Sequence, residues 1–482
     1  MTSIKKNFFY SAILTGANYI FPLIVFPYVS RTLGVTNIGI CNFVSSVVHY
    51  FIIFSMLGVE TVGVREIAKA KGNRQELDKC FSSIFLLNTI FTLIAIFVYS
   101  LCVLFIPKLH AYSDLMWIGA IELAFNLIAI EWLFKGLEEF KFITSRTLLI
   151  KVLFVISVFI FVKEPSDYKI YFVLTALSLG INAVINCIYA RNYVRLLFKK
   201  LSYKMFLWPI IILGVYSVLT NMYTTFNITF LGFASNDTEV GYYSTAQKIF
   251  VITLSIFTAL TRVMLPRMSS LIGQNKLEEY KALLKKTTEL LISFSFPLII
   301  FVFFLAKDII YVISGEGYEG AIVPLKIMAP LLFVWGYEQI LVIQGLMPLK
   351  KDKSILVNSI VGAIIGLSLN FIIVPHLESV GTAIVWFVSE GTVLIIAQFY
   401  LQKYVGVVFP FKLLLLHILY LIPLLGIEWL ICTLPLYSFF RLIIAIFVTF
   451  LYVAVLHLCF LKQSMFNGIM TQYIEKIRNR KI

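Results

Sequence analysis

Fourteen long apolar stretches dominate this sequence and limit the folds that it can adopt. A helix needs about 20 apolar residues to cross the hydrocarbon core of a bilayer, and each stretch comes close to that length. The stretches do not alternate with a period of two, which argues against the strands of a membrane β-barrel. The sequence therefore predicts an all-α integral membrane protein with about 14 transmembrane helices. They are expected near residues 8–29, 38–59, 81–105, 115–134, 147–162, 170–190, 205–231, 244–264, 290–306, 325–346, 354–374, 382–400, 413–431 and 439–460.

The composition agrees with a chain whose main solvent is lipid. Of the 482 residues, 60% are hydrophobic and 13% are charged. A soluble domain has about 45–50% apolar and about 25% charged residues. These values argue against a soluble enzyme, a disordered protein and a secreted disulfide scaffold.

The distribution of Lys and Arg predicts the orientation in the membrane. Cytoplasmic connections of membrane proteins are enriched in these residues. If the N-terminus is cytoplasmic and basic residues at span ends are assigned to the flanking segments, 32 of the 40 Lys and Arg residues fall inside, seven fall outside, and Lys248 is left within a span. Both termini are therefore expected in the cytoplasm. The net charge of +15 is then explained by the orientation of the chain in the membrane and by contact of its cytoplasmic side with anionic lipids. We therefore expect no nucleic-acid partner.

Residue patterns typical of enzymes and cofactor proteins are missing from the sequence. The six cysteines are scattered through or beside the spans, without the spacing of zinc ligands or a redox pair. There is no G-x-x-x-x-G-K-[ST] loop for ATP, and the outside connections carry no cluster of acids or histidines suited to catalysis. We expect no catalytic residue, metal or cofactor, and no enzyme activity.

Two pairs of similar segments suggest an internal repeat of six helices. Residues 31–47 and 229–249 both contain Leu-Gly, a short polar turn and a second Gly, which pairs Gly34 with Gly232 and Gly39 with Gly241. The segments starting at Arg65 and Pro266 also resemble each other. A repeat of six would relate two parallel halves by an axis along the membrane normal, as in transporters that rock around a central site. The predicted lobes are residues 1–200 and 201–405, followed by residues 406–482, which hold two further helices and a cytoplasmic tail.

Two cations are candidate ligands for an anion. Ionisable groups within spans cost at least about 2.5–3.5 kcal/mol each at mid-membrane, so they usually face a cavity or a partner. Arg31 ends the first span and Lys248 lies one turn into the eighth, so the repeat places both near the outer ends of related helices. Together they could hold a phosphate. The alternative is that both side chains reach the outer interface and bind nothing specific.

Other polar residues within the spans are weaker candidates for cavity or ion-coupling roles. Glu122, Glu338, Glu390 and Asn221 are the chief ones, because a carboxyl group in a span can carry a proton. For each, a structural role is the competing interpretation. The remaining polar or aromatic candidates are His49, Glu131, Glu428, Asn18, Asn227, Gln339, Gln344, Asn370, Tyr223, Tyr242, Tyr243 and Tyr337.

The longest connection, from Pro266 to Glu289, is predicted to form an amphipathic helix at the cytoplasmic interface. The tail from Lys462 to Ile482 has a similar pattern.

Four segments together resemble one known family. They are FPYVSRTLGVTNIGICNFVSSVVHYF, LGVETVGVREIAKAKGN, EWLFKGLEEFKFIT and SNDTEVGYYSTAQKI. In this order they are similar to Wzx-type O-antigen and polysaccharide flippases of the multidrug/oligosaccharidyl-lipid/polysaccharide exporter superfamily. The Arg of the family's S-R-x-L-G pattern falls on Arg31, and the Lys of its E-V-G-Y-Y…K-I pattern falls on Lys248.

This resemblance implies a flippase for undecaprenyl-pyrophosphate-linked oligosaccharide repeat units in the bacterial inner membrane. It also implies two six-helix lobes around a cavity, alternating access, and cations that meet the pyrophosphate. A proton, a sodium ion or the membrane potential would bias the cycle, and membrane lipids and the polysaccharide polymerase machinery are possible partners. The alternatives are a multidrug or cation antiporter of the same superfamily, a lipid II flippase and, in another class, a membrane-embedded polysaccharide polymerase.

Overall fold

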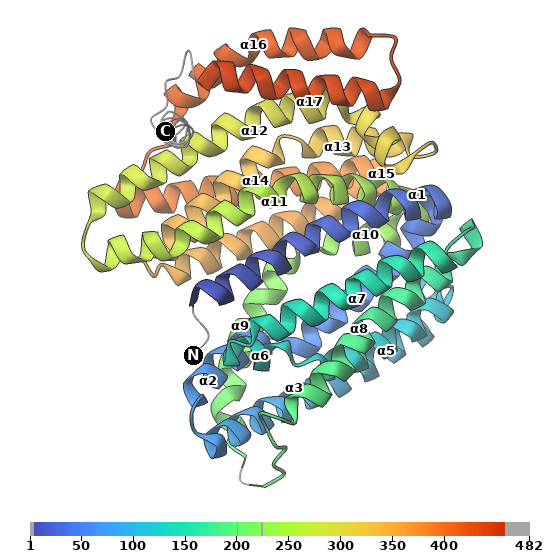
Figure 1. The fold of residues 1–482 in the computed structure, drawn as a ribbon, viewed down its shortest axis with the longest axis vertical. Coiled ribbons are helices and arrows are strands. Elements are labelled where there is room, and N and C mark those ends of the chain that lie inside the picture. Colours follow the sequence, from blue (N-terminus) through green and yellow to red (C-terminus); the bar gives the residue numbers. More distant parts are fainter. Residues whose placement is uncertain (1–3, 200, 223–224, 458–482) are drawn as a thin grey trace, which may run out of the picture. The chain divides into compact units, whose positions relative to one another are not determined.

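The computed structural model describes residues 4–199, 201–222 and 225–457, and the regular elements of these residues are all helices (Figure 1). Short 3₁₀ turns occupy Pro165–Asp167 and Glu319–Ala321, and a π-helix spans Ile340–Leu346. The α-helices are α1 (Ile4–Met56), α2 (Val59–Ala70), α3 (Arg74–Phe105), α4 (Pro107–His110), α5 (Ser113–Ala129), α6 (Glu131–Leu137), α7 (Phe140–Phe161), α8 (Tyr168–Ala190), α9 (Tyr203–Met222), α10 (Phe226–Ala234), α11 (Asp237–Gly273), α12 (Leu277–Ser314), α13 (Ile322–Met328), α14 (Leu331–Gln339), α15 (Asp352–Val405), α16 (Phe411–Thr433) and α17 (Ser438–Val455).

The described residues of the fourteen predicted stretches are mostly helical, although several stretches, such as 115–134 and 325–346, are divided between two or more helices. Among the described residues, nine helices are long and apolar enough to cross a membrane, or ten if the bent pair Glu319–Met328 and Leu331–Leu346 counts as one span. The all-α membrane fold is therefore confirmed, whereas the count of 14 stays a prediction.

Two of the nine helices are each too long for a single crossing. Helices α1 and α15 contain 53 and 54 residues. At 1.5 Å per residue each would be about 80 Å long, more than twice the apolar thickness of a bilayer. Both contain a break, at Gly34 (φ 77°) and at Glu378 (φ 47°). These breaks lie between the predicted stretches 8–29 and 38–59, and between 354–374 and 382–400.

The chain forms two compact units, which are described separately. Unit 1 contains Met1–Lys248, Ile313–Ala321 and Leu356–Ser389, and unit 2 contains Ile249–Val312, Ile322–Ile355 and Glu390–Ile482. The predicted lobe boundaries near residues 200 and 405 stay a prediction.

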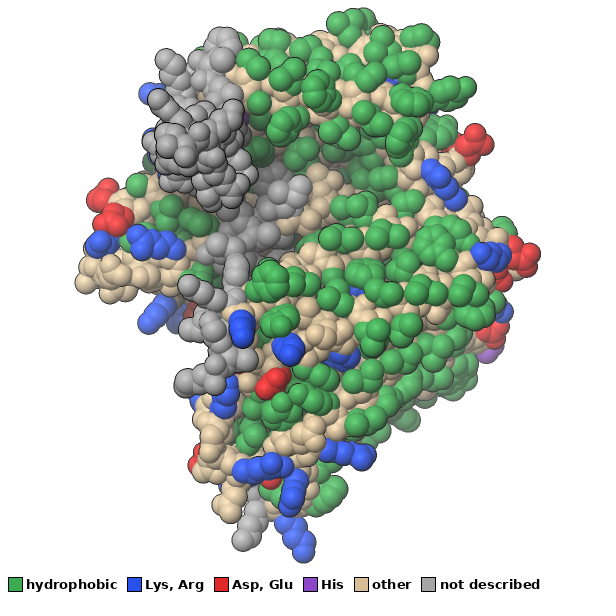
Figure 2. Space-filling model, in the orientation of Figure 1, with side chains coloured by type: hydrophobic (Ala, Val, Ile, Leu, Met, Phe, Trp, Pro, Cys, Tyr) green, Lys and Arg blue, Asp and Glu red, His purple; other side chains and the backbone are tan. Residues whose placement is uncertain are grey.

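In unit 1, helices α1, α3, α5, α7 and α8 pack into one bundle, in which α7 and α8 run side by side (Figure 1). Val25, Phe26 and Val29 of α1 pack with Val158 of α7. The opposite helix faces expose large apolar side chains, including Phe97 (65%) and Phe159 (37%). Hydrophobic side chains cover much of the face in Figure 2, whereas Lys and Arg gather toward the helix ends. An apolar exterior of this kind is suited to lipid.

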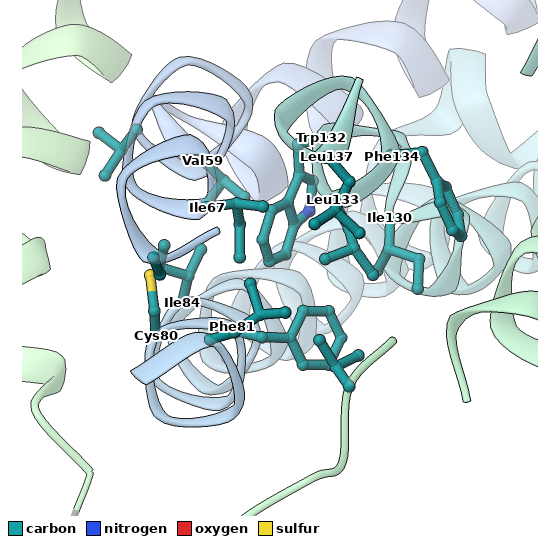
Figure 3. Close-up of a cluster of buried hydrophobic side chains, with 14 of the residues drawn as sticks. Val59, Ile67, Cys80, Phe81, Ile84, Ile130, Trp132, Leu133, Phe134 and Leu137 are labelled. Atoms are coloured by element: carbon teal, nitrogen blue, oxygen red, sulfur yellow. The ribbon is translucent and has the colours of Figure 1, made fainter. Parts of the chain in front are cut away.

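A second cluster in unit 1 fixes the short helices α2 and α6 against α3 (Figure 3). The Trp132 ring stacks on Phe81, with 5.4 Å between ring centroids. Gly63 lets α2 approach this ring, because a Cβ at that position would lie 2.5 Å from it. Helix α6 is bracketed by two left-handed residues, Ile130 (φ 36°) and Glu138 (φ 63°). The helical backbone of the fourth predicted span is therefore interrupted at Ile130, just before its charged end.

In unit 2, the C-terminal helices α16 and α17 pack against α12. Leu421 and Leu424 form a buried cluster with Leu456. Asp308 of α12 is 3% exposed and pairs with Arg441 of α17 at 2.9 Å. Arg441 also donates hydrogen bonds to the carbonyl groups of Leu434 and Leu436, so it holds the turn between α16 and α17.

The predicted interfacial helix from Pro266 to Glu289 is wrong as a single element. Residues 266–273 continue α11, and α12 begins at Leu277. A tight turn separates them, in which Asn275 takes a left-handed conformation (φ 59°). Asn and Gly tolerate this conformation, so the Gly273-Gln-Asn sequence ends the helix. The predicted amphipathic tail, Lys462–Ile482, lies outside the described residues.

Candidate functional site

The two repeat segments of the sequence meet within unit 1. The hydroxyl groups of Thr36 and Thr238 are 2.9 Å apart, and Asn42 donates to Ser244 at 2.8 Å. Both pairs are separated by 202 residues in the sequence. We call this contact between α1 and the start of α11 the repeat seam.

Two glycines allow the backbones to touch at the repeat seam. A Cβ on Gly39 would lie 1.7 Å from the carbonyl oxygen of Asp237, and one on Gly241 would lie 2.2 Å from that of Val35. Gly39 thus faces Asp237, four residues before Gly241, and Gly241 faces Val35, four residues before Gly39. Such reciprocal contacts are what a two-fold axis produces, so the seam has internal pseudo-two-fold symmetry.

The same register recurs beside the seam. The Asn37 amide donates to the carbonyl of Pro165, between α7 and α8, at 2.8 Å. Its counterpart 202 positions later, Glu239, accepts the backbone N–H of Ser379 at 3.2 Å. The expected equivalence of Gly39 and Gly241 agrees with this register, whereas Gly34 and Gly232 are only 198 positions apart and are not equivalent.

Arg31 lies on α1, and Lys248 of α11 contacts the same stretch of that helix. Arg31 is exposed on α1, and its aliphatic stem lies against Gly315, where a Cβ would be 3.1 Å from Arg31 Cγ. The half-buried Lys248 ammonium lies over the ring of Phe26, 4.6 Å from its centroid. A cation over an aromatic face is attracted by the ring quadrupole. Phe26 precedes Arg31 by about one and a half helical turns.

Loops from both halves of the sequence close over this end of the seam. The Tyr112 hydroxyl lies 2.8 and 2.7 Å from the carboxylate oxygens of Asp237. Lys108 donates to the carbonyl of Ser235 at 3.4 Å, and Tyr318 donates to the carbonyl of Ser30 at 2.8 Å. If the predicted orientation holds, this is the outer end of the seam.

The remaining predicted site residues divide between the units. In unit 1, Glu122 is half-buried on α5, and the Asn221 amide donates to the carbonyl of Ser217 in its own helix at 2.8 Å. In unit 2, Glu338 is buried and accepts a hydrogen bond from Gln339 at 2.7 Å, and Glu390 is buried on α15. A common site for these residues stays a prediction.

Several of the other polar candidates are buried and form hydrogen bonds within the protein. Asn370 donates to the buried Asn227 at 2.9 Å, and the Tyr337 hydroxyl donates to Gln398 at 2.7 Å. Glu428 is fully buried and accepts a hydrogen bond from Thr449. Tyr243 and Gln344 are buried, Tyr242 is half-buried, Asn18 and His49 are exposed, and Tyr223 lies outside the described residues. Within the described ranges, no cluster of three or more His, Cys, Asp or Glu side chains could hold a metal ion.

One polar cluster in unit 1 was missed by the sequence analysis. Arg146 of α7 is 5% exposed and pairs with Glu131 at 2.7 Å. Arg146 also donates to Asn186 of α8. The signal that could have revealed it is the spacing of four between Glu131 and Lys135, and between Asn182 and Asn186, which places each pair on one helix face.

Comparisons with known proteins agree with this fold. The lipid II flippase MurJ in an inward closed conformation superimposes with a TM-score of 0.78, at 15% identity, over 93% of this chain and 99% of that one. An inward-facing multidrug resistance MATE family transporter of the MOP superfamily gives a TM-score of 0.66, at 14% identity, over 80% and 94% of the two chains.

Sequence relatives carry transporter names. A "Putative O-antigen transporter" of Escherichia coli (strain K12) is 27% identical over 393 residues, which cover 80% of this chain and 94% of that protein. A protein of the same name from Shigella dysenteriae is 25% identical over 288 residues, 58% of this chain and 70% of its own.

The fold and the many apolar helices define a multi-pass membrane protein with the architecture of the exporter superfamily. The polysaccharide biosynthesis protein family matches residues 4–272, and the MatE family matches residues 209–372. The first match covers more than half of the sequence, so the chain belongs to the polysaccharide biosynthesis protein family. The resemblance to Wzx-type flippases is thereby confirmed.

The glycine contacts predict that the thermal stability of the protein depends strongly on the size of the residues at positions 39 and 241. Replacing Gly39 or Gly241 by Ala should lower the midpoint of thermal unfolding, because the new methyl group meets backbone that cannot rotate away. Overpacking of this kind typically costs about 1–3 kcal/mol. Gly16→Ala is the matched control, since a Cβ on Gly16 in the same helix meets nothing within 4 Å. Equal stability of the three variants would contradict this account.

The seam also predicts a specific cross-link. Cysteines replacing Thr36 and Thr238 should form a disulfide under mild oxidation, because the two hydroxyl oxygens are 2.9 Å apart. Mass spectrometry of non-reduced peptides from the membrane-inserted protein would detect it. Thr36→Cys paired with Thr175→Cys, on α8, is the control and should remain reduced. The absence of the 36–238 disulfide would argue against the seam.

Proposed function

We propose that this protein is a flippase for undecaprenyl-pyrophosphate-linked oligosaccharide repeat units. It carries each unit from the inner to the outer leaflet of the bacterial inner membrane, for synthesis of O-antigen or capsule. The family match and the relatives named as O-antigen transporters support a lipid-linked saccharide as cargo. The observation that carries the proposal is the placement of Lys248 against the stretch of α1 that bears Arg31.

The two cations suit a pyrophosphate. The Arg31 guanidinium offers two parallel donors to neighbouring phosphate oxygens, and the Lys248 ammonium acts as a point charge. Both lie on the helices that the glycine contacts bring together, Arg31 on α1 and Lys248 on α11. Their charges offset part of the free energy needed to remove the pyrophosphate from water, while the polyprenyl tail stays in the surrounding lipid.

The repeat seam supports the proposal that transport occurs by alternating access. Tyr112, Lys108 and Tyr318 close one end of the seam through hydrogen bonds from loops. If both termini are cytoplasmic, this end faces outward and the structure represents a state closed to the outside. Release of cargo then requires the contacts between Thr36 and Thr238, and between Asn42 and Ser244, to separate.

The energy source is a proton, a sodium ion or the membrane potential, and Glu122, Glu338 and Glu390 are our candidates for coupling. Membrane lipids and the polysaccharide polymerase are the expected neighbours. The chain itself transports its cargo without covalent chemistry. The fold similarity to MurJ makes a lipid II flippase the second candidate. Accumulation of peptidoglycan precursor in depleted cells, in place of polysaccharide repeat units, would favour that function.

Charge reversal tests the pyrophosphate site. Arg31→Glu and Lys248→Glu should each reduce the recovery of surface polysaccharide in a deletion strain by about tenfold or more, since hydrogen bonds to charged groups contribute roughly 1.5–3 kcal/mol. Lipid-linked units should accumulate in the inner leaflet. Lys163→Glu, an exposed change of the same charge, is the control. Full recovery by inserted Arg31→Glu and Lys248→Glu proteins would overturn the site assignment.

Locking the seam tests the transport cycle. The Thr36→Cys/Thr238→Cys protein should lose export of lipid-linked units when oxidised and regain it when a reductant is added, because the disulfide prevents separation. Each single cysteine variant should export under both conditions. Undiminished export by the cross-linked protein would exclude opening at this seam as part of the cycle.

A further inference from the structure

Each unit contains a pocket at the ends of its helices that are expected on the cytoplasmic side. The pocket of unit 1 has a volume of about 350 Å³ and lies between α3, the junction of α5 and α6, and the end of α8. The pocket of unit 2 has a volume of about 300 Å³ and lies between α12, the junction of α14 and the π-helix, and the end of α15. Both volumes suit a small-molecule site. We call them the connector pockets, because the segment that follows α8 or α15 also lines each one.

The two connector pockets use corresponding parts of the predicted six-helix repeat. Each is lined by the helices that carry the third, fourth and sixth predicted spans of its half. Phe81 lies seven residues after the start of α3, and Leu284 lies seven residues after the start of α12. The fourth span is interrupted at both pockets, by the left-handed Ile130 (φ 36°) and by the π-helix that begins at Ile340. An arrangement that recurs in both halves belongs to the fold and is not an accident of one loop.

Hydrogen bonds fix the segment that follows the last helix of each pocket. In unit 1, Asp78 of α3 accepts the backbone N–H of Arg195 at 2.8 Å, and the Ser82 hydroxyl donates to the Arg195 carbonyl at 3.4 Å. In unit 2, Gln398 donates to the carbonyl of Val407 at 2.8 Å. Each connector pocket therefore has a defined wall, although these segments are not helical.

The residues that line each connector pocket include two basic ones and no acidic one. They are Arg191 and Arg195 in unit 1, and Lys281 and Lys285 in unit 2. Both arginines are exposed and form no ion pair with the described residues. Lys285 is likewise exposed, whereas Lys281 pairs with the exposed Glu278 at 2.9 Å. Guanidinium and ammonium groups both bind phosphate, so the pockets favour an anionic ligand.

Apolar side chains in and beside the connector pockets favour a lipid over a soluble anion. In unit 1 the half-buried Phe85 and Ile128 contribute to the wall. The segment after α8 exposes Leu196 (50%) and Phe198 (88%), and the segment after α15 exposes Val408 (64%). Exposed apolar side chains beside cations at a membrane surface enter the acyl-chain region, while the charges stay at the headgroups.

We propose that each connector pocket binds one anionic glycerophospholipid of the cytoplasmic leaflet. Its phosphate lies at the basic side chains, and the upper part of its acyl chains lies against the apolar wall. Basic pockets between membrane helices on the cytoplasmic side bind anionic headgroups in other proteins. This lipid is a bound ligand distinct from the cargo, so the proposal goes beyond the proposed function and does not depend on it.

The test measures lipid binding to the purified full chain by native mass spectrometry. Phosphatidylglycerol should bind saturably at two sites, at concentrations where phosphatidylcholine does not bind. Arg191→Gln/Arg195→Gln should remove one site and Lys281→Gln/Lys285→Gln the other. Each double change should weaken binding at its site roughly thirtyfold, because a Lys or Arg beside anionic lipid contributes a factor of about five.

Two further variants control for folding and for general attraction to the membrane. Arg191→Lys/Arg195→Lys keeps the charge and should retain most of the binding. Arg74→Gln/Lys141→Gln removes two exposed cations on the same predicted side that line neither pocket, so both bound lipids should remain.

The proposal fails if phosphatidylcholine binds equally well, or if neither glutamine pair weakens the binding of phosphatidylglycerol. An equal loss in the Arg74→Gln/Lys141→Gln protein would show general surface attraction in place of a site. Displacement by glycerol 1-phosphate, which lacks acyl chains, would indicate a site for soluble anions. Displacement by an equal amount of undecaprenyl phosphate would assign the pockets to the cargo and also overturn the proposal.

Discussion

The backbone contact at Gly39 and Gly241 is the constraint on which the rest of unit 1 depends. A side chain at either position would occupy the space of a carbonyl group in the opposite segment. The close approach sets the register in which Thr36 meets Thr238, and it brings Lys248 against Phe26. Without it, the cation in the second half of the sequence would not lie beside the helix that bears Arg31. The symmetry of the seam is therefore a condition for the proposed anion site.

Charges inside this protein occur in two different surroundings. Arg146 is buried and pairs with the partly exposed Glu131, and such pairing keeps the free energy of burying Arg146 low. Lys248 instead faces an aromatic ring, which stabilises the ammonium less than a carboxylate at the same distance would. A cation that is only weakly compensated in this way attracts an anionic ligand more strongly than one in a tight ion pair. This difference separates Lys248 from the structural charges.

Much of the fold was predictable because lipid imposes a simple rule on helix length and polarity. The described residues of the fourteen apolar stretches are mostly helical, and the pairing of Gly39 with Gly241 followed from the similar sequences around them. The break at Glu378 and the turn at Asn275 were harder to predict from the sequence, because a single left-handed residue leaves the hydrophobic pattern unchanged. The Arg146 cluster was missed because its members come from three helices, and one sequence does not reveal which faces of those helices meet.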